Sequence, residues 1–505
     1  MSTTSTGAAG VPLSMKLPGV YIQVLFGASP NGAGGGTRKV LLLGNKLATG
    51  SATADTEKIA LTSAADAVTY FGEGSELALM ATAAYTKAPA ASLEAIAVTE
   101  PAGAKASATI TVANAATGSG TATFYIHGVK ISVSVLSGDA LGTVAANINA
   151  EINAKSSLLN VTSAVLAGVV TITARHNGTR GNLIKLRKVI DATVTGSTFT
   201  LSAAALAGGA GVDALTTALA TAATARDHYY ALASVDTTAV QAVQAQCDTM
   251  AGPLVGKRQV FVWASHDTLG TATTQVETVN EERGQCLWAY KFETLPCVIA
   301  AAWAAMRSVA ESESISVNLS SFNPDLVDLW PVVQAPPSEG DWATDSAANS
   351  ALDVGLTPLQ VRQGDKHPYI PLSITTHSND SSGNPDARTL TTNYVQVPDL
   401  FADTFAAWLP STFVGMKLRS DQESGDDPLP PNVTTPGIVQ AMWFDVARRD
   451  FENQGHINGL DDDGASWAFN LVSANPNRLN ATIPITPAPW FTQASAQVRQ
   501  QTPGS

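Results

Sequence analysis

VLLLG, residues 40–44, is the stretch that decides the fold class. A short, continuous apolar run of this kind suits a strand that is buried on both faces of a sheet. Two helical segments follow it, at 64–71 and 75–85, and a second strand is predicted at 93–99. Strands that alternate with helices in this way predict an α/β layer structure.

The same alternation returns in the second half of the chain. Strands are predicted at 229–234 and 259–265, and helices at 237–250, 271–279 and 298–309. This order favours a mostly parallel sheet. Towards the C-terminus we predict two strands, at 370–376 and 394–397, and two helices, at 399–408 and 438–451.

The segment between these two α/β parts has a different pattern. Apolar and polar residues alternate at 108–112, 129–135 and 170–174, which is typical of strands with one buried and one wet face. Asp139 is placed to cap a helix with apolar positions at helical spacing. This unit closes at the glycines of 208–211, and we interpret it as a compact β-rich domain inserted into the surrounding one.

The N-terminal stretch LPGVYIQVLF, residues 17–26, is also strand-like. It lies between a Ser/Thr/Gly/Ala-rich tail and the Gly-rich residues 27–36, which cannot hold a fixed shape alone. Its backbone groups must still find partners. One solution is to join the sheet edge of another subunit; an ordinary first strand followed by a loose loop is the alternative. The chain ends similarly, with extended segments at 481–485 and 494–501.

Composition excludes several classes of protein. The net charge is −13 and no run of Lys or Arg occurs, which argues against a nucleic-acid-binding protein. Three cysteines, Cys247, Cys286 and Cys297, do not form the pattern of a disulfide framework. The most apolar run, 297–306, is too short to cross a bilayer, and the N-terminal residues do not have the basic-then-apolar pattern of a signal peptide. We expect a soluble product without an export signal or membrane insertion.

Sequence patterns for metal and phosphate sites are missing. The histidines lack H-x-x-x-H spacing, and neither HExxH nor C-x-x-C occurs. The Gly-rich stretches at 27–36 and 44–50 do not end in Gly-Lys-Ser/Thr. Residues 461–464 resemble part of a calcium loop, but Gly459 and Asn470 occupy ligand positions, so we predict an acidic turn.

Signals for catalysis are equally weak. No Gly-x-Ser-x-Gly elbow is present. Ser234, His266 and Asp267 could be imagined as a triad, but residues of these types are common and nothing in the sequence places them together. We therefore predict no catalytic, cofactor or metal residue.

Several stretches, taken in order, resemble the contractile phage tail sheath proteins of the Mu-like type. His377 replaces the tyrosine expected after a Thr-Thr pair, and the region from Trp330 to Ser350 has no match. The resembling stretches are 18–21, 40–44, 71–75 with 79–80, 173–175 with 178–182, 351–356 with 361 and 374–376, and 475–480.

The resemblance implies an α/β sheath core, of the fold described as subtilisin-like, with an inserted β-sandwich-like domain and extended N- and C-terminal arms. A fold label of this kind carries no expectation of hydrolysis. The implied divisions are an N-terminal arm and linker at 1–38, the first part of the core at 39–100, the inserted domain at 101–210, the α/β sheath domain at 211–370, a C-terminal sheath domain at 371–490 and a C-terminal arm at 491–505.

The resemblance also implies a function. The chain would be a structural subunit that stacks as hexameric rings around a tail tube and contracts by rigid-body movement, in contact with itself, the tube, the baseplate and the tail terminator. Its place would be the virion tail, assembled in the host cytoplasm. A tail-fibre or adhesin-type binding protein and an enzyme built on the α/β part are the alternatives.

Three groups of residues would form the linkage between subunits. The N-terminal arm would contribute Val20, Tyr21, Ile22, Gln23, Val24, Leu25 and Phe26. The hinge would lie at Gly27, Gly32, Gly34, Gly35 and Gly36. The C-terminal arm would contribute Ile483, Ile485, Gln497, Val498 and Arg499.

Overall fold

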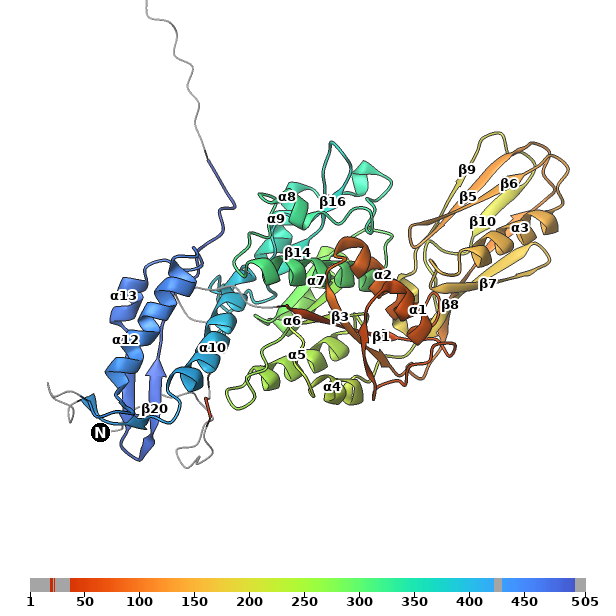
Figure 1. Ribbon diagram of the computed structural model, residues 1–505. Coiled ribbons are helices and arrows are strands. Elements are labelled where there is room, and N and C mark those ends of the chain that lie inside the picture. The colour runs from red at the N-terminus through yellow and green to blue at the C-terminus, as the bar shows by residue number, and fades with distance from the viewer. Residues whose placement is uncertain (1–18, 21, 23–36, 422–428, 496–505) are drawn as a thin grey trace, which may run out of the picture.

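A seven-stranded sheet forms the centre of the protein in the computed structural model, which describes residues 19, 20, 22, 37–421 and 429–495 (Figure 1). All neighbouring strands run parallel except the edge pair β2–β3. In sheet order the strands are β14 (Leu356–Pro358), β13 (Gly284–Trp288), β12 (Val260–Ser265), β11 (Tyr229–Leu232), β1 (Lys39–Asn45), β3 (Ser92–Val98) and β2 (Lys58–Leu61).

The apolar stretch at 40–44 lies in β1, near the middle of this sheet, as predicted. Val40 and Leu42 belong to the apolar cluster on one face, and Leu41 and Leu43 to the cluster on the other, so successive side chains serve opposite faces. Helices cover both faces, which explains why the strand has no polar side: α2 (Glu76–Lys87) and α7 (Pro296–Glu313) on one, and α4 (Thr216–Ala222), α5 (Thr237–Ala251) and α6 (Leu269–Val279) on the other.

Serine N-caps mark the starts of the first two helices. The hydroxyls of Ser63 and Ser75 accept the backbone N–H groups of Asp66 and Ala78, so each caps the helix that follows it. The helices predicted at 64–71 and 75–85 are confirmed as α1 (Ala64–Phe71) and α2.

Between β3 and β11 the chain forms two antiparallel sheets, ordered β10-β4-β8-β7 and β6-β5-β9. His127 and Gly128, with φ of 38° and 91°, make the turn between β5 and β6. The predicted Asp139 cap is wrong: Ala140 is the N-cap, and Asp139 accepts the Leu136 N–H instead (2.9 Å). The elements are β4 (Lys105–Ala113), β5 (Gly120–Ile126), β6 (Val129–Val135), α3 (Leu141–Ala154), β7 (Val161–Leu166), β8 (Val169–Asn177), η1 (Thr179–Leu183), β9 (Leu186–Ile190) and β10 (Thr198–Leu201).

The C-terminal part packs around aromatic rings. The C-terminal aromatic cluster, as we call it, includes the T-shaped pairs of Trp443 with Phe401 (5.0 Å between centroids) and with Phe405 (4.8 Å). Its other aromatic members are Phe451, Trp467 and Phe469. The elements here are α10 (Asn393–Thr412), α12 (Pro436–Ala447), the π-helical turn η3 (Arg448–Glu452), α13 (Leu460–Ala465), β19 (Ala468–Val472) and β20 (Asn475–Thr482).

Three predictions in this part are wrong. Residues 394–397 are the start of α10, not a strand, because the helical stripe through Val397, Leu400 and Phe401 is buried in the aromatic cluster. Residues 370–376 form only isolated bridges, since hydroxyls such as that of Thr376 bond backbone carbonyls directly. The acidic turn predicted at 461–464 is the short helix α13.

The remaining elements are short, and none of the helices in the described part of the chain is long and apolar enough to cross a membrane. They are α8 (Pro324–Val327), η2 (Glu339–Asp341), α9 (Asp345–Asp353), β15 (Gln360–Val361), β16 (Pro368–Tyr369), β17 (Lys417–Leu418) and β18 (Val433–Thr434).

Candidate functional site

Four arginines lie at the amino-terminal ends of four neighbouring strands in the central sheet. Each comes one to three residues before a strand: Arg38 before β1, Arg226 before β11, Arg258 before β12 and Arg283 before β13. Because these strands are parallel neighbours, their amino ends meet at the same edge. We call these four residues the arginine row.

Helix α10 lies against the arginine row. Its Gln396, Asp399 and Asp403 are spaced by three and four residues, so they share one helix face. Arg38 donates from Nη1 to the Gln396 Oε1 (2.8 Å). The row therefore joins the sheet to the helix that carries the C-terminal aromatic cluster.

The carboxylates of α10 take the charged contacts. Arg283 donates from both Nη atoms to Asp399 (2.6 and 2.9 Å). Asp403 receives Arg226 on one oxygen (2.6 Å) and Arg258 on the other (2.7 Å). Paired, planar contacts of this type are among the strongest that a guanidinium makes.

Most of these charged side chains are buried, and their burial affects their pKa values. The side chains of Arg258, Arg283 and Asp399 are 2%, 4% and 5% exposed. Burial acts to raise the pKa of Asp399, but the Arg283 guanidinium outweighs it and holds that pKa below its ordinary value. Asp399 is thus ionised at neutral pH, and the pKa of Arg283 is raised in turn, mainly by Asp399 working against burial.

The predicted N-terminal arm reaches this same place. The backbone carbonyl of Ile22 accepts a hydrogen bond from Arg258 Nη2 (3.0 Å), and its side chain packs against the C-terminal aromatic cluster. The short coloured piece of the N-terminal segment can be followed beside α10 in Figure 1. Val20 is described as well, and it is half-buried.

The other predicted arm and hinge residues lie outside the described residues. These are Tyr21, Gln23, Val24, Leu25 and Phe26, the hinge glycines Gly27, Gly32, Gly34, Gly35 and Gly36, and the C-terminal Gln497, Val498 and Arg499.

The backbone groups of Arg38 and Lys39 are hydrogen-bonded beside the arginine row. The backbone N–H of Arg38 donates to the Ser312 hydroxyl (2.9 Å), and that of Lys39 donates to His228 Nδ1 (3.2 Å). Burial, with Arg38 and Arg226 nearby, lowers the pKa of His228 to about 3, so its ring is neutral and can accept.

Two residues of the predicted C-terminal arm contact the C-terminal aromatic cluster. Ile485 is buried in it, and Ile483 packs against it. Beyond them, Trp490 Nε1 donates to the Ser316 carbonyl (2.9 Å), and Asn318 donates to the Phe491 carbonyl (3.0 Å). Ile22, Ile483 and Ile485 therefore contact the same cluster, whereas Trp490 packs against the central apolar cluster.

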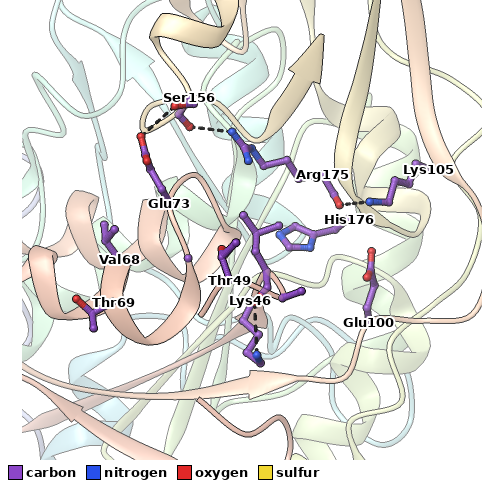
Figure 2. Close-up of a pocket in the computed structure, with 13 residues that line it drawn as sticks. Lys46, Thr49, Val68, Thr69, Glu73, Glu100, Lys105, Ser156, Arg175 and His176 are labelled. Carbon is purple, nitrogen blue, oxygen red and sulfur yellow. Dashed lines mark hydrogen bonds between the residues drawn. The ribbon is translucent and has the colours of Figure 1, made fainter. Parts of the chain in front are cut away.

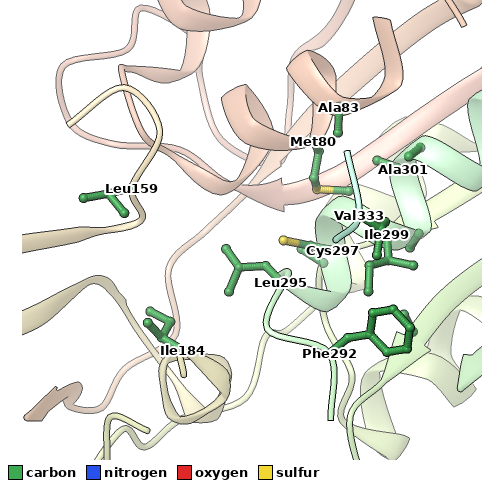
Figure 3. Packing of buried hydrophobic residues seen from close by; sticks show 14 of the residues in the cluster. Met80, Ala83, Leu159, Ile184, Phe292, Leu295, Cys297, Ile299, Ala301 and Val333 are labelled. Carbon is green, nitrogen blue, oxygen red and sulfur yellow. The ribbon is translucent and has the colours of Figure 1, made fainter. Parts of the chain in front are cut away.

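The sheet and the two antiparallel sheets share a buried junction (Figure 3). Ile184 and Leu159 belong to the same apolar cluster as Leu295. Beside it, buried Arg180 pairs with Glu76 (2.6 Å) and with Asp213 (3.0 Å). Arg180, Glu76 and Asp213 come from different parts of the chain, so the junction ties the two parts together.

A polar cleft of about 650 Å³ opens next to this junction (Figure 2). Arg175 donates to the carbonyls of Leu159 (3.1 Å) and Ser156 (3.3 Å), and Glu73 accepts the Ser156 hydroxyl (3.0 Å). Burial, with nearby cations, lowers the pKa of His176 to about 3. The charged side chains named here hold local structure, and the histidine is too weak a base for acid–base work at neutral pH.

The imagined triad is not assembled. Asp267 accepts the hydroxyl of Ser265 (2.9 Å), while neither ring nitrogen of His266 nor the Ser234 hydroxyl has a hydrogen-bond partner among the described residues. Burial lowers the pKa of His266 to about 3. Within the described ranges no group of three or more His, Cys, Asp or Glu side chains is placed to hold a metal ion.

The arginine row escaped the sequence analysis, although a signal was present. Arg226 and Arg258 each precede a predicted strand, and Asp399 and Asp403 are four residues apart in a predicted helix. Parallel strands bring their starts together, so an Arg at each start and a pair of Asp at helical spacing could have suggested the contact. Arg283 gave no such signal because β13 was not predicted.

Comparisons with known proteins complete the description. No protein-family model matches the sequence. The chain is 25% identical over 483 residues to the Mu-like prophage FluMu tail sheath protein of Haemophilus influenzae, which covers 93% of this chain and 94% of that protein. The resemblance found in the sequence is thereby confirmed.

Three solved structures of sheath proteins have a chain path similar to that of this protein. The sheath tail protein Lin1278 from Listeria innocua has a TM-score of 0.48 at 13% identity, covering 90% of this chain and 93% of that one. The sheath tail protein from Desulfitobacterium hafniense has 0.46 at 13%, covering 89% and 93%. The anti-feeding prophage helical sheath in its contracted state has 0.45 at 10%, covering 97% and 99%.

Proposed function

We propose that this chain is a structural subunit of a contractile phage tail sheath. One observation carries the proposal: the similarity to a Mu-like prophage tail sheath protein runs over 93% of this chain and 94% of that protein. The subunits would stack as hexameric rings around a tail tube, and their contraction would drive the tube through the host envelope.

The arms would link neighbouring subunits by exchanging strands. In this proposal residues 20–26 and the C-terminal residues Ile483, Ile485 and 497–499 contact other copies, and the glycines of 27–36 act as the hinge. The contacts of Ile22 and Ile485 support it, because one residue from each proposed arm lies at the C-terminal aromatic cluster. Linkage through terminal arms would leave the whole folded subunit free to rotate as one body.

The remainder of the subunit would move as a rigid unit. The buried Arg180 contacts and the shared apolar cluster support this, since a junction with ion pairs and close packing resists bending (Figure 3). On this proposal residues 101–210 are a β-sandwich-like domain inserted into a subtilisin-like core. The divisions at 39–100, 211–370 and 371–490 are proposed in the same way.

The energy for contraction would be stored in the assembly. We propose that the extended sheath is metastable and that contraction buries more surface between subunits, because only a state with more favourable contacts can drive the change. The chain would assemble in the host cytoplasm and function in the virion tail. Its partners would be other copies, the tube, the baseplate and the tail terminator, without nucleic acid, membrane insertion or a cofactor.

Electron microscopy of the purified full chain tests the proposal. We expect tubes or hexameric rings to form. Discrete trimers that bind a glycan would replace the proposal with the tail-fibre or adhesin alternative. Monomers that hydrolyse a substrate would replace it with an enzyme.

A further inference from the structure

The polar cleft lies where the central sheet meets the two antiparallel sheets (Figure 2). On the side of the central sheet, Lys46 directly follows β1, and Glu100 comes two residues after β3, its parallel neighbour. Ligands of open α/β sheets bind outside the carboxyl ends of such strands. On the other side, Lys105 of β4 and Arg175 of β8 line the same cleft, whose volume of about 650 Å³ suits a small organic molecule.

Three cations line this cleft without forming an ion pair with any described residue: Lys46, Lys105 and Arg175. Lys46 Nζ donates to the Gly50 carbonyl (3.0 Å), and Lys105 Nζ donates to the Arg175 carbonyl (2.5 Å). The Arg175 guanidinium also bonds carbonyls only. A lysine has three N–H donors and an arginine five. Each cation therefore keeps donors for a ligand, while its bonds to carbonyls hold it in place beforehand.

The charges of the cleft favour an anion. Apart from the three cations, Glu73 and Glu100 are the charged residues of its lining, so three positive and two negative charges leave a net of one positive charge. The whole chain carries −13, and a cationic cleft stands out against it. Glu73 accepts the Ser156 hydroxyl, and Glu100 accepts the Asn177 N–H. Each glutamate uses one oxygen in this way, which leaves the other to accept a hydroxyl group of the ligand.

His176 lines the cleft as a buried polar side chain without a hydrogen bond. It is 4% exposed, and neither of its ring nitrogens has a partner among the described residues. An unpaired buried polar group destabilises a protein. In Figure 2 the ring points from β8 towards the middle of the cleft, and Lys105 and Glu100 are near it. A small turn about χ2, a torsion with a broad preference, presents a nitrogen to a ligand and relieves this cost.

The cations surround the cleft and do not converge on one point. Figure 2 shows Lys46, Lys105 and Arg175 on three different sides of it, an arrangement that suits anionic groups held apart by a carbon skeleton. We propose that the cleft binds a small organic molecule with two anionic groups and with hydroxyl groups between them. Sugar acids and sugar phosphates share this chemistry.

Each part of such a molecule finds a contact in the cleft. The cations bind its anionic ends, Glu100 and His176 bind its hydroxyl groups, and Val68 contacts its carbon atoms. Lys46 belongs to the central sheet and Lys105 to an antiparallel sheet, so the bound molecule joins these two parts and stabilises the folded chain by mass action. No step depends on polymerisation, and the inference is therefore independent of the proposed function.

Isothermal titration calorimetry of the full chain with two probes tests the proposal. Glucarate presents two carboxylates and fructose bisphosphate two phosphates, so the two titrations distinguish the kinds of anion. We expect at least one probe to bind with a Kd below ~1 mM, and gluconate, which lacks one carboxylate, to bind about tenfold more weakly than glucarate if glucarate is the better probe; fructose monophosphate serves in the same way for the bisphosphate.

Two results of these titrations would overturn the proposal. One is no binding of either probe at ~10 mM. The other is inorganic phosphate that binds as tightly as the better probe, since the cleft would then hold an adventitious ion only.

Three variants assign the site. Lys105→Met should weaken binding of the better probe about tenfold, because it removes a charged donor. Lys130→Met is the matched control, since Lys130 is also exposed and lies on β6, outside the cleft; it should change binding less than twofold. His176→Phe should weaken binding about fivefold and leave the Tm of the free chain unchanged or higher, because it replaces an unpaired polar ring by an apolar ring of similar size.

Equal losses in Lys105→Met and Lys130→Met would reduce the effect to general charge attraction and overturn the site. Unchanged binding by His176→Phe, or a lower Tm of its free chain, would overturn the part assigned to the ring. A second measurement supports the calorimetry: the better probe should raise the Tm of the unchanged chain and raise that of Lys105→Met less.

Discussion

Replacing Arg283 by methionine should detach α10 from the sheet. Both members of the Arg283–Asp399 pair are about 95% buried and share two hydrogen bonds, of 2.6 and 2.9 Å. Removing one partner of a buried pair costs ~3–5 kcal/mol, because the other charge stays behind uncompensated. Arg258 Nε lies 3.7 Å from Asp399 and offsets part of the loss, so we expect about 3 kcal/mol.

Urea unfolding followed by tryptophan fluorescence measures this loss, and hydrogen exchange in α10 locates it. The pKa of Asp399 is held below its ordinary value, so the pair's contribution is full above pH ~4 and falls as acid protonates the carboxylate. The difference between the two proteins should therefore be constant from pH 8 to about 5 and shrink below pH ~4.

Two variants check the reasoning behind this magnitude. Arg226→Met, whose carboxylate keeps Arg258, should cost less than ~1 kcal/mol because its side chain is 24% exposed. Arg283→Met with Asp399→Leu removes both charges and should be more stable than Arg283→Met alone. A loss below ~1 kcal/mol in Arg283→Met, or a double variant that is less stable still, would refute the argument.

Four further predictions follow from the same kind of observation. Lys58→Met should cost ~3 kcal/mol in urea unfolding, because it leaves buried Asp227 without its 2.7 Å partner. Burial, helped by Glu282 and Asp248, raises the pKa of Glu281 to about 8. The contribution of this carboxyl group to stability is therefore full below pH ~4.5 and is lost as the pH rises through 8. Tm should fall less steeply with rising pH in Glu281→Gln than in the unchanged protein. Deleting residues 1–26 should leave the circular dichroism spectrum unchanged and abolish tubes in electron micrographs, and tubes from that protein would contradict the arm proposal. Ser234→Ala should leave assembly unaffected, because its hydroxyl has no partner among the described residues.

A strand of the central sheet could be predicted from the sequence where both of its faces are buried. Residues 40–44 form a strand in sequence and in structure because helices cover both faces, so an unbroken apolar run is enough to identify it. The strand β13 was missed for the opposite reason. Its Gln285 is buried at the centre of a polar group and bonds Trp303 (2.9 Å) and Arg307 (2.7 Å). No local pattern reveals that a polar residue will find such partners.

The candidate site could be predicted only in part. The strand-like pattern at 17–26 drew attention to Ile22, but Arg258 is 236 residues away from it along the chain. Pairing over that distance depends on the order of strands in the sheet, which local periodicity does not contain. The two aspartates of α10 were placed in a predicted helix, whereas Gln396 was placed in a predicted strand, which concealed the face that the three residues share.

The arginine row gives the junction a property that the aromatic cluster cannot supply. Aromatic pairs accept both offset-stacked and edge-to-face arrangements over centroid distances of ~4.5–7 Å, so they do not specify a single geometry. A guanidinium that donates two bonds to one carboxylate fixes both the distance and the direction of α10 against the sheet. Buried ion pairs add little to stability compared with apolar residues of the same size, and their better-attested use is to specify one arrangement. In a subunit proposed to move as a rigid unit while its arms stay attached, the row keeps the body that contacts Ile22 and Ile485 in one orientation to the core.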